Sequence, residues 1–164
     1  DNESETFYIY DCYRVSKASP TVHAQNIKMR PHFIPIAYPH DGNRRDSMGN
    51  PGLADQYRNL GCNFLLEHFT NPPALGTNKG SNSVEEGLMA MLQSVESGKF
   101  KVFSPLSDWF EEFRMYHRKD GKVVPIRDDL MSATRYAFQS QRFAVAGEDP
   151  TWTKDVTYGH YGIV

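Results

Sequence analysis

The chain has 164 residues, of which 39% are hydrophobic and 23% are charged, and its formal net charge is −2. This length and composition are typical of one globular domain with a real core, and no apolar run approaches the length that crosses a bilayer. The near-neutral charge excludes a global basic field for nucleic acid, but it does not exclude a local basic face. Cys12 and Cys62 lie in apolar strand-like runs, which favours free buried thiols over a disulfide or a metal site.

Strands alternate with helices in the secondary structure that the sequence predicts. Aromatic, β-branched and apolar runs indicate the strands, and serine or proline starts with glycine ends indicate most of the helices. The expected strands span residues 6–13, 34–41, 62–67 and 99–103, and the expected helices span residues 19–30, 51–60, 83–97, 104–113 and 128–144. This order predicts an α/β domain over residues 1–146, with a mixed sheet flanked by helices on both faces, followed by a tail at 147–164.

Two stretches carry acids in places where chemistry can occur. The apolar run from Ile34 ends at Asp41–Gly42, so it delivers Asp41 to the carboxyl end of a buried strand, where ligands bind in open α/β sheets. Asp128 and Asp129 are adjacent at the start of the last helix. The helix dipole explains one acid there, whereas two allow one to cap the helix and the other to point into a cleft. By analogy, this arrangement suits the ribonuclease H-like architecture.

Carboxylates that converge from separate elements are the ligands that Mg²⁺ or Mn²⁺ prefers. Two such ions, about 4 Å apart, can neutralise a scissile phosphate and activate a water molecule. We therefore expect Asp41 and Asp129 to bind two catalytic ions, with Asp128 and Asp46 as auxiliary ligands. Two of these acids also have an ordinary interpretation: Asp41 can be a turn residue, and Asp46 can be a solvated loop acid. Glu85 is expected to serve the start of its helix rather than catalysis.

A basic hairpin is predicted over residues 116–126, immediately before the acidic helix. Asp120–Gly121 can form its two-residue type I′ turn. Such a finger can contact phosphates on either side of a metal site, although a solvated hairpin is an equally good interpretation of the composition. The basic residues expected to bind DNA are Arg118, Lys119 and Lys122 on the hairpin and Arg44 and Arg45 beside Asp41.

Three blocks of sequence together carry a resemblance that runs from about residue 6 to residue 143. They are Pro-His-Asp-Gly at 39–42, Asn-Ser-Val-Glu-Glu-Gly-Leu at 82–88, and a long block within 98–137 that includes Arg127–Leu130. These blocks resemble the nuclease domain of large terminase subunits from tailed bacteriophages that package by the headful mechanism. Some members have histidine and, three residues later, aspartate where this chain has Asp129 and Ser132, which favours Asp129 over Asp128 as the metal ligand.

The resemblance implies a ribonuclease H-like fold that cuts concatemeric double-stranded DNA with two metal ions during genome packaging. It also implies an ATPase domain N-terminal to the nuclease in the same polypeptide, the portal protein and the small terminase subunit as partners, and no membrane. The implied location is the host cytoplasm, at the procapsid portal. The family's first metal-binding acid lies on a strand that normally precedes residues 6–13, and we expect this chain to lack that strand.

Two other functions are compatible with the same residues. The first is a non-catalytic module on the same fold that docks to the portal or to DNA. The second is another ribonuclease H-like phosphodiesterase, such as a junction resolvase or an integrase-like enzyme, which would prefer branched or hybrid substrates.

Overall fold

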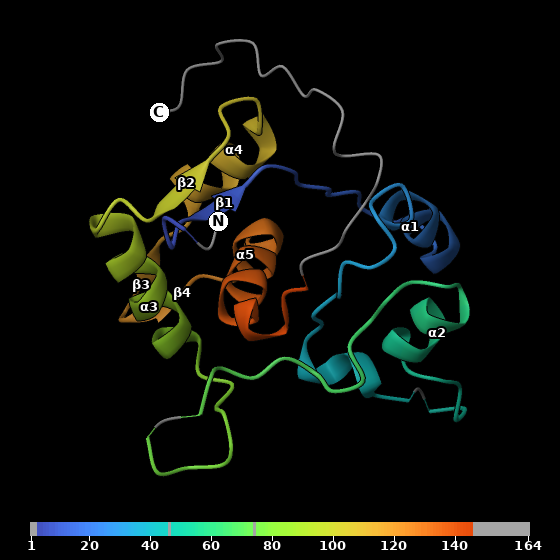
Figure 1. Cartoon of the computed structure of the whole chain (residues 1–164). Coiled ribbons are helices and arrows are strands. Elements are labelled where there is room, and N and C mark those ends of the chain that lie inside the picture. The colour runs from blue at the N-terminus through green and yellow to red at the C-terminus, as the bar shows by residue number, and fades with distance from the viewer. Residues whose placement is uncertain (1–2, 46, 74, 146–164) are drawn as a thin grey trace. The chain divides into compact units, whose positions relative to one another are not determined.

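The computed structural model of the chain describes residues 3–45, 47–73 and 75–145 (Figure 1). These residues belong to two compact units, each of which is described by itself. Unit 1 joins the chain up to Arg14 to Ser83–Phe138, and unit 2 joins Val15–Asn82 to the segment that begins at Gln139. Asp46 and the expected tail at 147–164 lie outside the described residues.

A parallel pair of strands lies at the centre of unit 1. Strand β1 (Phe7–Ile9) pairs with strand β2 (Phe100–Val102), with Phe7 opposite Phe100 and Ile9 opposite Val102 (Figure 1). One backbone bond flanks each end of the ladder: Phe7 N donates to Lys99 O over 2.8 Å, and Phe103 N donates to Ile9 O over 2.9 Å. The strands expected at 6–13 and 99–103 therefore exist but are shorter than predicted.

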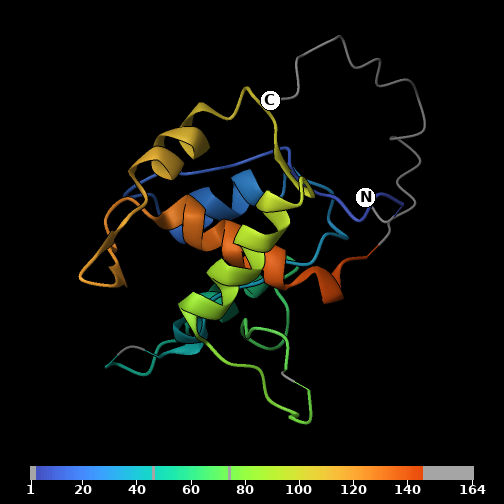
Figure 2. The same cartoon turned by 90° about the vertical axis from the view of Figure 1, so that its left-hand side faces the viewer.

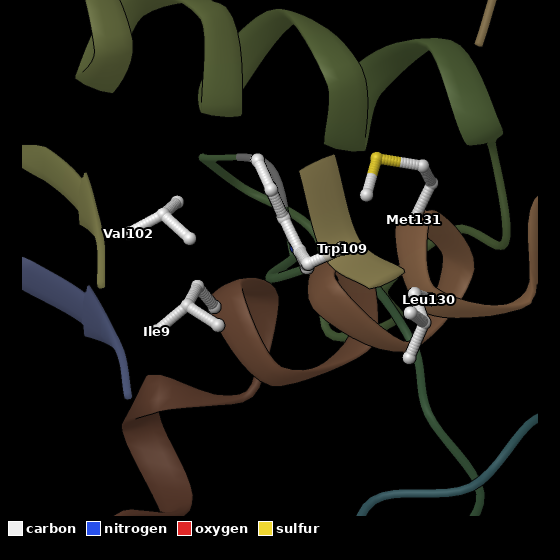
Figure 3. Packing of buried hydrophobic residues seen from close by; sticks show 5 residues of the cluster. All are labelled: Ile9, Val102, Trp109, Leu130 and Met131. Atoms are coloured by element: carbon white, nitrogen blue, oxygen red, sulfur yellow. The ribbon is translucent and has the colours of Figure 1, made fainter. Parts of the chain in front are cut away.

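Three helices complete unit 1, and two of them build its core with the strands. Helix α3 spans Val84–Glu96, α4 spans Ser107–Met115 and α5 spans Asp129–Gln139. Figure 3 shows Ile9 and Val102 on the strand side of Trp109, and Leu130 and Met131 of α5 on its other side. All five side chains are at most 9% exposed. The core therefore forms where the apolar face of α5 meets α4 and the strands, as apolar burial favours.

The hairpin predicted at 116–126 is present in unit 1. Strand β3 (Arg118–Lys119) pairs antiparallel with strand β4 (Lys122–Val123), drawn gold to orange in Figure 2. Asp120 and Gly121 have φ angles of +51° and +76°, as a type I′ turn requires, so the predicted turn is confirmed. A groove of about 450 Å³ separates the hairpin from α3. Its lining residues are Leu88, Met89, Leu92, Tyr116, His117, Arg118 and Val123.

Unit 2 is built from short helices and extended segments. Its helices are α1 (Pro20–Ile27) and α2 (Leu53–Asn59), and its 3₁₀ turns are η1 (His40–Asn43) and η2 (Gln141–Phe143). The strands expected at 34–41 and 62–67 are wrong as full strands, because in the described residues these two segments form a single parallel bridge, between Ile36 and Phe64. Ile36 makes both bonds of this bridge, because its N donates to Asn63 O and its O accepts from Leu65 N. The regular ladder ends at Tyr38, whose carbonyl accepts from Phe69 N instead.

The helix starts divide into confirmed and corrected predictions. Ser19 and Ser83 cap α1 and α3, as their side chains accept from Val22 N and Glu86 N. Helix α4 begins at Ser107 rather than near residue 104, because Leu106 N first closes a turn onto Phe103 O. Helix α5 ends at Gln139 instead of near residue 144. None of the helices in the described ranges is long and apolar enough to cross a bilayer.

Candidate active site

The acidic start of α5 is the first part of the candidate site. Asp128 occupies the position before the helix, where its carbonyl accepts from Ser132 N over 2.8 Å. Its carboxylate accepts from the Ser132 hydroxyl at 3.4 Å. Asp128 is half-buried and Asp129, the first residue of α5, is exposed. The predicted placement of both acids at a helix start is confirmed, although in the described contacts the Asp128 carboxylate bonds to the Ser132 hydroxyl and not to the amides of the first turn.

A buried carboxylate from another helix caps α5 instead. Oε2 of Glu112 in α4 accepts from Leu130 N at 2.7 Å and from Met131 N at 3.4 Å. These are the amides that an N-cap side chain normally satisfies. The residue is 0% exposed. Glu112 was not among the site residues predicted from the sequence. The available signal was an acid among the aromatic residues of a helix, between Trp109 and Phe113.

Arg14 balances the charge of the buried carboxylate. Its guanidinium donates to Glu112 Oε1 at 2.6 Å and lies 3.6 Å from the more exposed Glu111. The bond to Glu112 raises the pKa of the Arg14 guanidinium. Glu111 also pairs with Arg127, at 3.1 Å, in the turn before α5. The charge of Glu112 is therefore compensated within unit 1, next to the two acids that the helix start exposes.

The base of the hairpin lies close to these acids, as predicted. Tyr116, at that base, packs against the core cluster that includes Leu130 and Met131 of α5. Burial raises the pKa of Tyr116, and the negative charge of Asp128 raises it further. Arg118 forms an ion pair with Glu85 of α3. Glu85 therefore serves as a partner for the hairpin. Lys119 and Lys122 face each other across the turn and are exposed.

Asp41 lies in unit 2, exposed in the 3₁₀ turn η1. Arg44 N closes the turn by donating to Asp41 O at 2.9 Å. A Cβ added at Gly42 would approach the ring of Tyr38 to 2.7 Å, so the turn rests directly on that ring. Tyr38 is 3% exposed. Its hydroxyl donates to a backbone oxygen, Leu66 O, at 3.0 Å.

Arg58 of α2 holds this ring and the neighbouring chain in place. Its guanidinium donates to the Tyr38 hydroxyl at 2.9 Å and also to the carbonyl of Leu65. It pairs with Asp55 at 2.7 Å. The segment that carries Asp41 is thus anchored by these side chains together with the backbone bridge at Ile36 and the bond from Phe69 N to Tyr38 O.

The structure groups the predicted site residues by unit. Asp128, Asp129 and the hairpin lie in unit 1, and Asp41 lies in unit 2 with the exposed Arg44 and Arg45. The meeting of Asp41 with Asp129 stays a prediction. Within the described ranges, no three His, Cys, Asp or Glu residues gather as a metal cluster. The donors of α5 nevertheless suit a hard cation, because Mg²⁺ is usually bound by one or two carboxylates and keeps several waters.

Comparison with known proteins links this geometry to one family. Residues 1–141 match the family model described as "Terminase RNaseH-like domain". The chain is 36% identical over 145 residues to the large terminase subunit of Salmonella phage P22, which covers 88% of this chain and 28% of that protein. It is 35% identical over 139 residues to the large terminase subunit of Enterobacteria phage LP7, covering 84% of this chain and 28% of that protein.

A solved structure supports the same link. The structure of the P22 large terminase nuclease domain matches with a TM-score of 0.76 and 35% identity, covering 88% of this chain and 72% of that chain. This match and the family model confirm the predicted α/β, ribonuclease H-like fold class. The chain spans 28% of the length of the two phage relatives.

Proposed function

The chain belongs to the terminase RNaseH-like domain family, and from that premise we propose that it is the DNA-cutting nuclease domain of a phage large terminase subunit. It cleaves concatemeric double-stranded DNA during genome packaging. The 35% identical P22 nuclease domain supports a nuclease over a portal-docking module or a junction resolvase. The proposed domain spans residues 1–146, with residues 147–164 as a tail.

The observation that carries the proposal is the start of α5. Two adjacent acids lie there, and Glu112 takes over the capping of the amides behind them. A carboxylate that caps its own helix has its lone pairs turned toward the backbone amides. In the described part of the chain, the amides of Leu130 and Met131 bond to Glu112 and not to Asp128 or Asp129, so the oxygens of the two acids stay available to a cation.

Asp41 and Asp129 would hold two Mg²⁺ or Mn²⁺ ions, with Asp128 and Asp46 as auxiliary ligands. Such ions supply charge neutralisation at the scissile phosphate and an activated water when they are bound. In this proposal η1 presents the Asp41 carboxylate from unit 2 and α5 presents Asp129 from unit 1. The packing of Gly42 against the Tyr38 ring and the capping of α5 by Glu112 support the backbone that carries the two acids.

The hairpin would hold the DNA beside the acids. Lys119 and Lys122 are exposed at its turn, while Glu85 already engages Arg118. We therefore assign the larger share of phosphate binding on the hairpin to the two lysines and the smaller share to Arg118. Arg44 and Arg45, exposed beside Asp41, would contact phosphates on the other side of the cut. Contacts of this kind position a duplex without reading its sequence.

The wider setting follows from the large terminase subunits that this chain resembles. In the intact protein the nuclease would follow an ATPase motor domain of the same polypeptide. The portal protein and the small terminase subunit would be its partners. The proposed site of action is the procapsid portal in the host cytoplasm, where cutting occurs as packaging begins and when the head is full.

Plasmid cleavage with Mg²⁺ or Mn²⁺ tests the catalytic part of the proposal. Asp41→Ala and Asp129→Ala should each lower the cleavage rate by a factor on the order of 10² or more, since each removes a metal ligand. Asp108→Ala is the matched control, because Asp108 is also an exposed acid in the first turn of a helix. Cleavage at the parent rate by both test variants would show that the site is assigned wrongly.

Salt titration of DNA binding tests the hairpin. The Lys119→Ala/Lys122→Ala double variant should weaken binding and reduce the salt slope by up to about two counterions, while metal affinity stays at the parent value. Lys79→Ala, at an exposed lysine of unit 2, serves as the control. An unchanged slope in the double variant would remove the hairpin from the DNA path.

A further inference from the structure

We propose that Glu112 is a positioning residue of the nuclease site, whose buried carboxylate fixes the first turn of α5 and so orients Asp128 and Asp129 toward the metal ions. The inference rests on the proposed function and adds to it a residue that touches neither DNA nor metal. It starts from one observation: a side chain of α4 caps the helix that carries the acids.

The contacts of Glu112 divide its two oxygens between two tasks. Oε2 accepts from the amides of Leu130 and Met131, at 2.7 and 3.4 Å. Oε1 accepts from Arg14 at 2.6 Å. A carboxylate bound on both oxygens cannot rotate without breaking one set of bonds. The first turn of α5 is therefore tied to α4 and to the segment that follows β1.

A second polar link sets the register of the two helices. Trp109 Nε1 donates to the Thr134 hydroxyl at 2.9 Å, and that hydroxyl donates to Leu130 O at 2.7 Å. Trp109 and Glu112 are three residues apart on α4, so they lie on the same face of the helix. The two links together prevent α5 from sliding or rotating against α4. The direction in which the first residues of α5 point is thereby set.

This arrangement separates capping from metal binding. In an ordinary helix start, the N-cap carboxylate accepts from the second and third amides. Here Glu112 occupies both amides, so Asp128 and Asp129 carry no capping duty in the described contacts. Arg14 offsets the charge of Glu112, which limits the repulsion that a third carboxylate would add beside the two acids. The cap can then stabilise the helix start without competing with a cation.

The test uses the full chain with Glu112→Gln, Glu112→Asp and Glu112→Ala. The matched control is Glu111→Ala, because Glu111 contacts Arg14 and Arg127 through their guanidinium groups, while the amides of Leu130 and Met131 bond to Glu112. Two quantities are measured: amide hydrogen exchange at Leu130 and Met131, and Mn²⁺ affinity by calorimetry. Neither needs cleavage of DNA, and both are taken far below the thermal midpoint of each variant.

The expected results differ between the substitutions. Glu112→Ala should speed exchange at Leu130 and Met131 about tenfold or more and weaken Mn²⁺ binding by about tenfold, the usual effect of losing a residue that orients a metal ligand. Glu112→Asp should weaken Mn²⁺ binding by a similar factor, since the shorter side chain cannot reach Arg14 and both amides together. Glu112→Gln should restore most of the exchange protection, because its amide oxygen still accepts. Glu111→Ala should match the parent in both measurements.

The outcomes separate this inference from the proposed function. If the parent takes up no Mn²⁺, the metal-dependent function is overturned and the inference falls with it. If the parent binds Mn²⁺ and Glu112→Asp binds it equally well, only the role of Glu112 is overturned. Because Glu112→Asp and Glu112→Gln keep a polar acceptor, they decide the question even where Glu112→Ala does not fold.

Discussion

Asp129 begins an eleven-residue helix, whereas Asp41 lies in a 3₁₀ turn of four residues. The helix start in unit 1 is fixed by a buried carboxylate and its guanidinium partner. The turn in unit 2 is fixed by a glycine packed against a buried tyrosine ring. Both acids are exposed, yet the backbone of one is capped directly by a charged side chain, while the other lies in a turn packed on a ring that Arg58 holds.

Two stretches far apart in the sequence therefore present similar carboxylates, but different substitutions should destabilise them. The unit 1 acids depend on a polar network, so removing one member leaves other groups buried without partners. The Asp41 turn depends on the absence of a side chain at Gly42, so adding atoms there is the more damaging change. Substitutions in the polar network and at Gly42 should therefore destabilise the two acidic segments to different extents.

The largest loss of unfolding free energy is expected from Glu112→Ala in unit 1. Removing the buried carboxylate leaves the amides of Leu130 and Met131 without their acceptor, and we expect this to cost about 2–4 kcal/mol. Arg58→Ala is the counterpart in unit 2, and it should cost about 1–2 kcal/mol, because the Arg58 side chain is 23% exposed and water can replace part of its bonding. Urea denaturation of both variants measures the difference. Equal losses would mean that the two acids are not supported differently.

Gly42→Ala should produce the next largest loss of unfolding free energy. The new Cβ would lie 2.7 Å from Tyr38 Cδ2, and the ring cannot swing away without breaking its bonds to Arg58 and Leu66. Overpacking of this kind costs about 1–3 kcal/mol. Adding Tyr38→Leu should recover part of the stability in a double-mutant cycle. A Gly42→Ala variant as stable as the parent would show that the turn is not packed on the ring.

Asp128→Ala should lower the free energy of unfolding much less than its position before the helix suggests. Replacing an N-cap aspartate by alanine typically costs about 1 kcal/mol. Because Glu112 satisfies the amides of the first turn, we expect a loss of only about 0.5 kcal/mol or less. Ser83→Ala, which removes a side-chain cap from α3, should cost about 1 kcal/mol and serves as the reference. A larger loss for Asp128→Ala than for Ser83→Ala would contradict the division of labour.

Thiol reactivity gives the smallest and most local comparison. Burial raises the pKa of Cys12 in unit 1, with Asp108 and Asp11 adding to it, and burial also raises the pKa of Cys62 in unit 2. Less thiolate is then present at pH 8, so alkylation by iodoacetamide should be slower at both than at a free thiol. Cys62, which is 6% exposed, should react more slowly than the half-buried Cys12. Mass spectrometry of the labelled chain would reveal a reversed order.

The raised pKa values of the two cysteines also determine the direction in which stability changes with pH. A thiol whose pKa is higher in the folded state than in the unfolded state contributes stability below the unfolded pKa, about 8.5. That contribution is lost as the pH rises through the folded value. Stability supplied by either cysteine should therefore decline above about pH 8.5 and remain constant below it.

The sequence was sufficient for features set by local rules. The turn at Asp120–Gly121, the serine caps of α1 and α3, and the acids at the start of α5 all follow from conformational preferences of a few adjacent residues. The expected strand at 34–41 failed in part because the Tyr38 carbonyl accepts from Phe69 N, two residues beyond the partner that a regular ladder would supply. Glu112 could not be found in this way, since its partners Arg14 and Leu130 are distant in sequence and only the folded chain brings them together.

Paramagnetic broadening by Mn²⁺ is the most direct test of the proposal that Asp41 and Asp129 share a metal site. With substoichiometric Mn²⁺ added to the full chain, the account predicts that amide signals of the Asp41 turn and of the start of α5 broaden together. It also predicts that Asp129→Asn weakens the broadening at both places. Broadening at α5 alone, with the signals around Asp41 unaffected, would contradict the shared site.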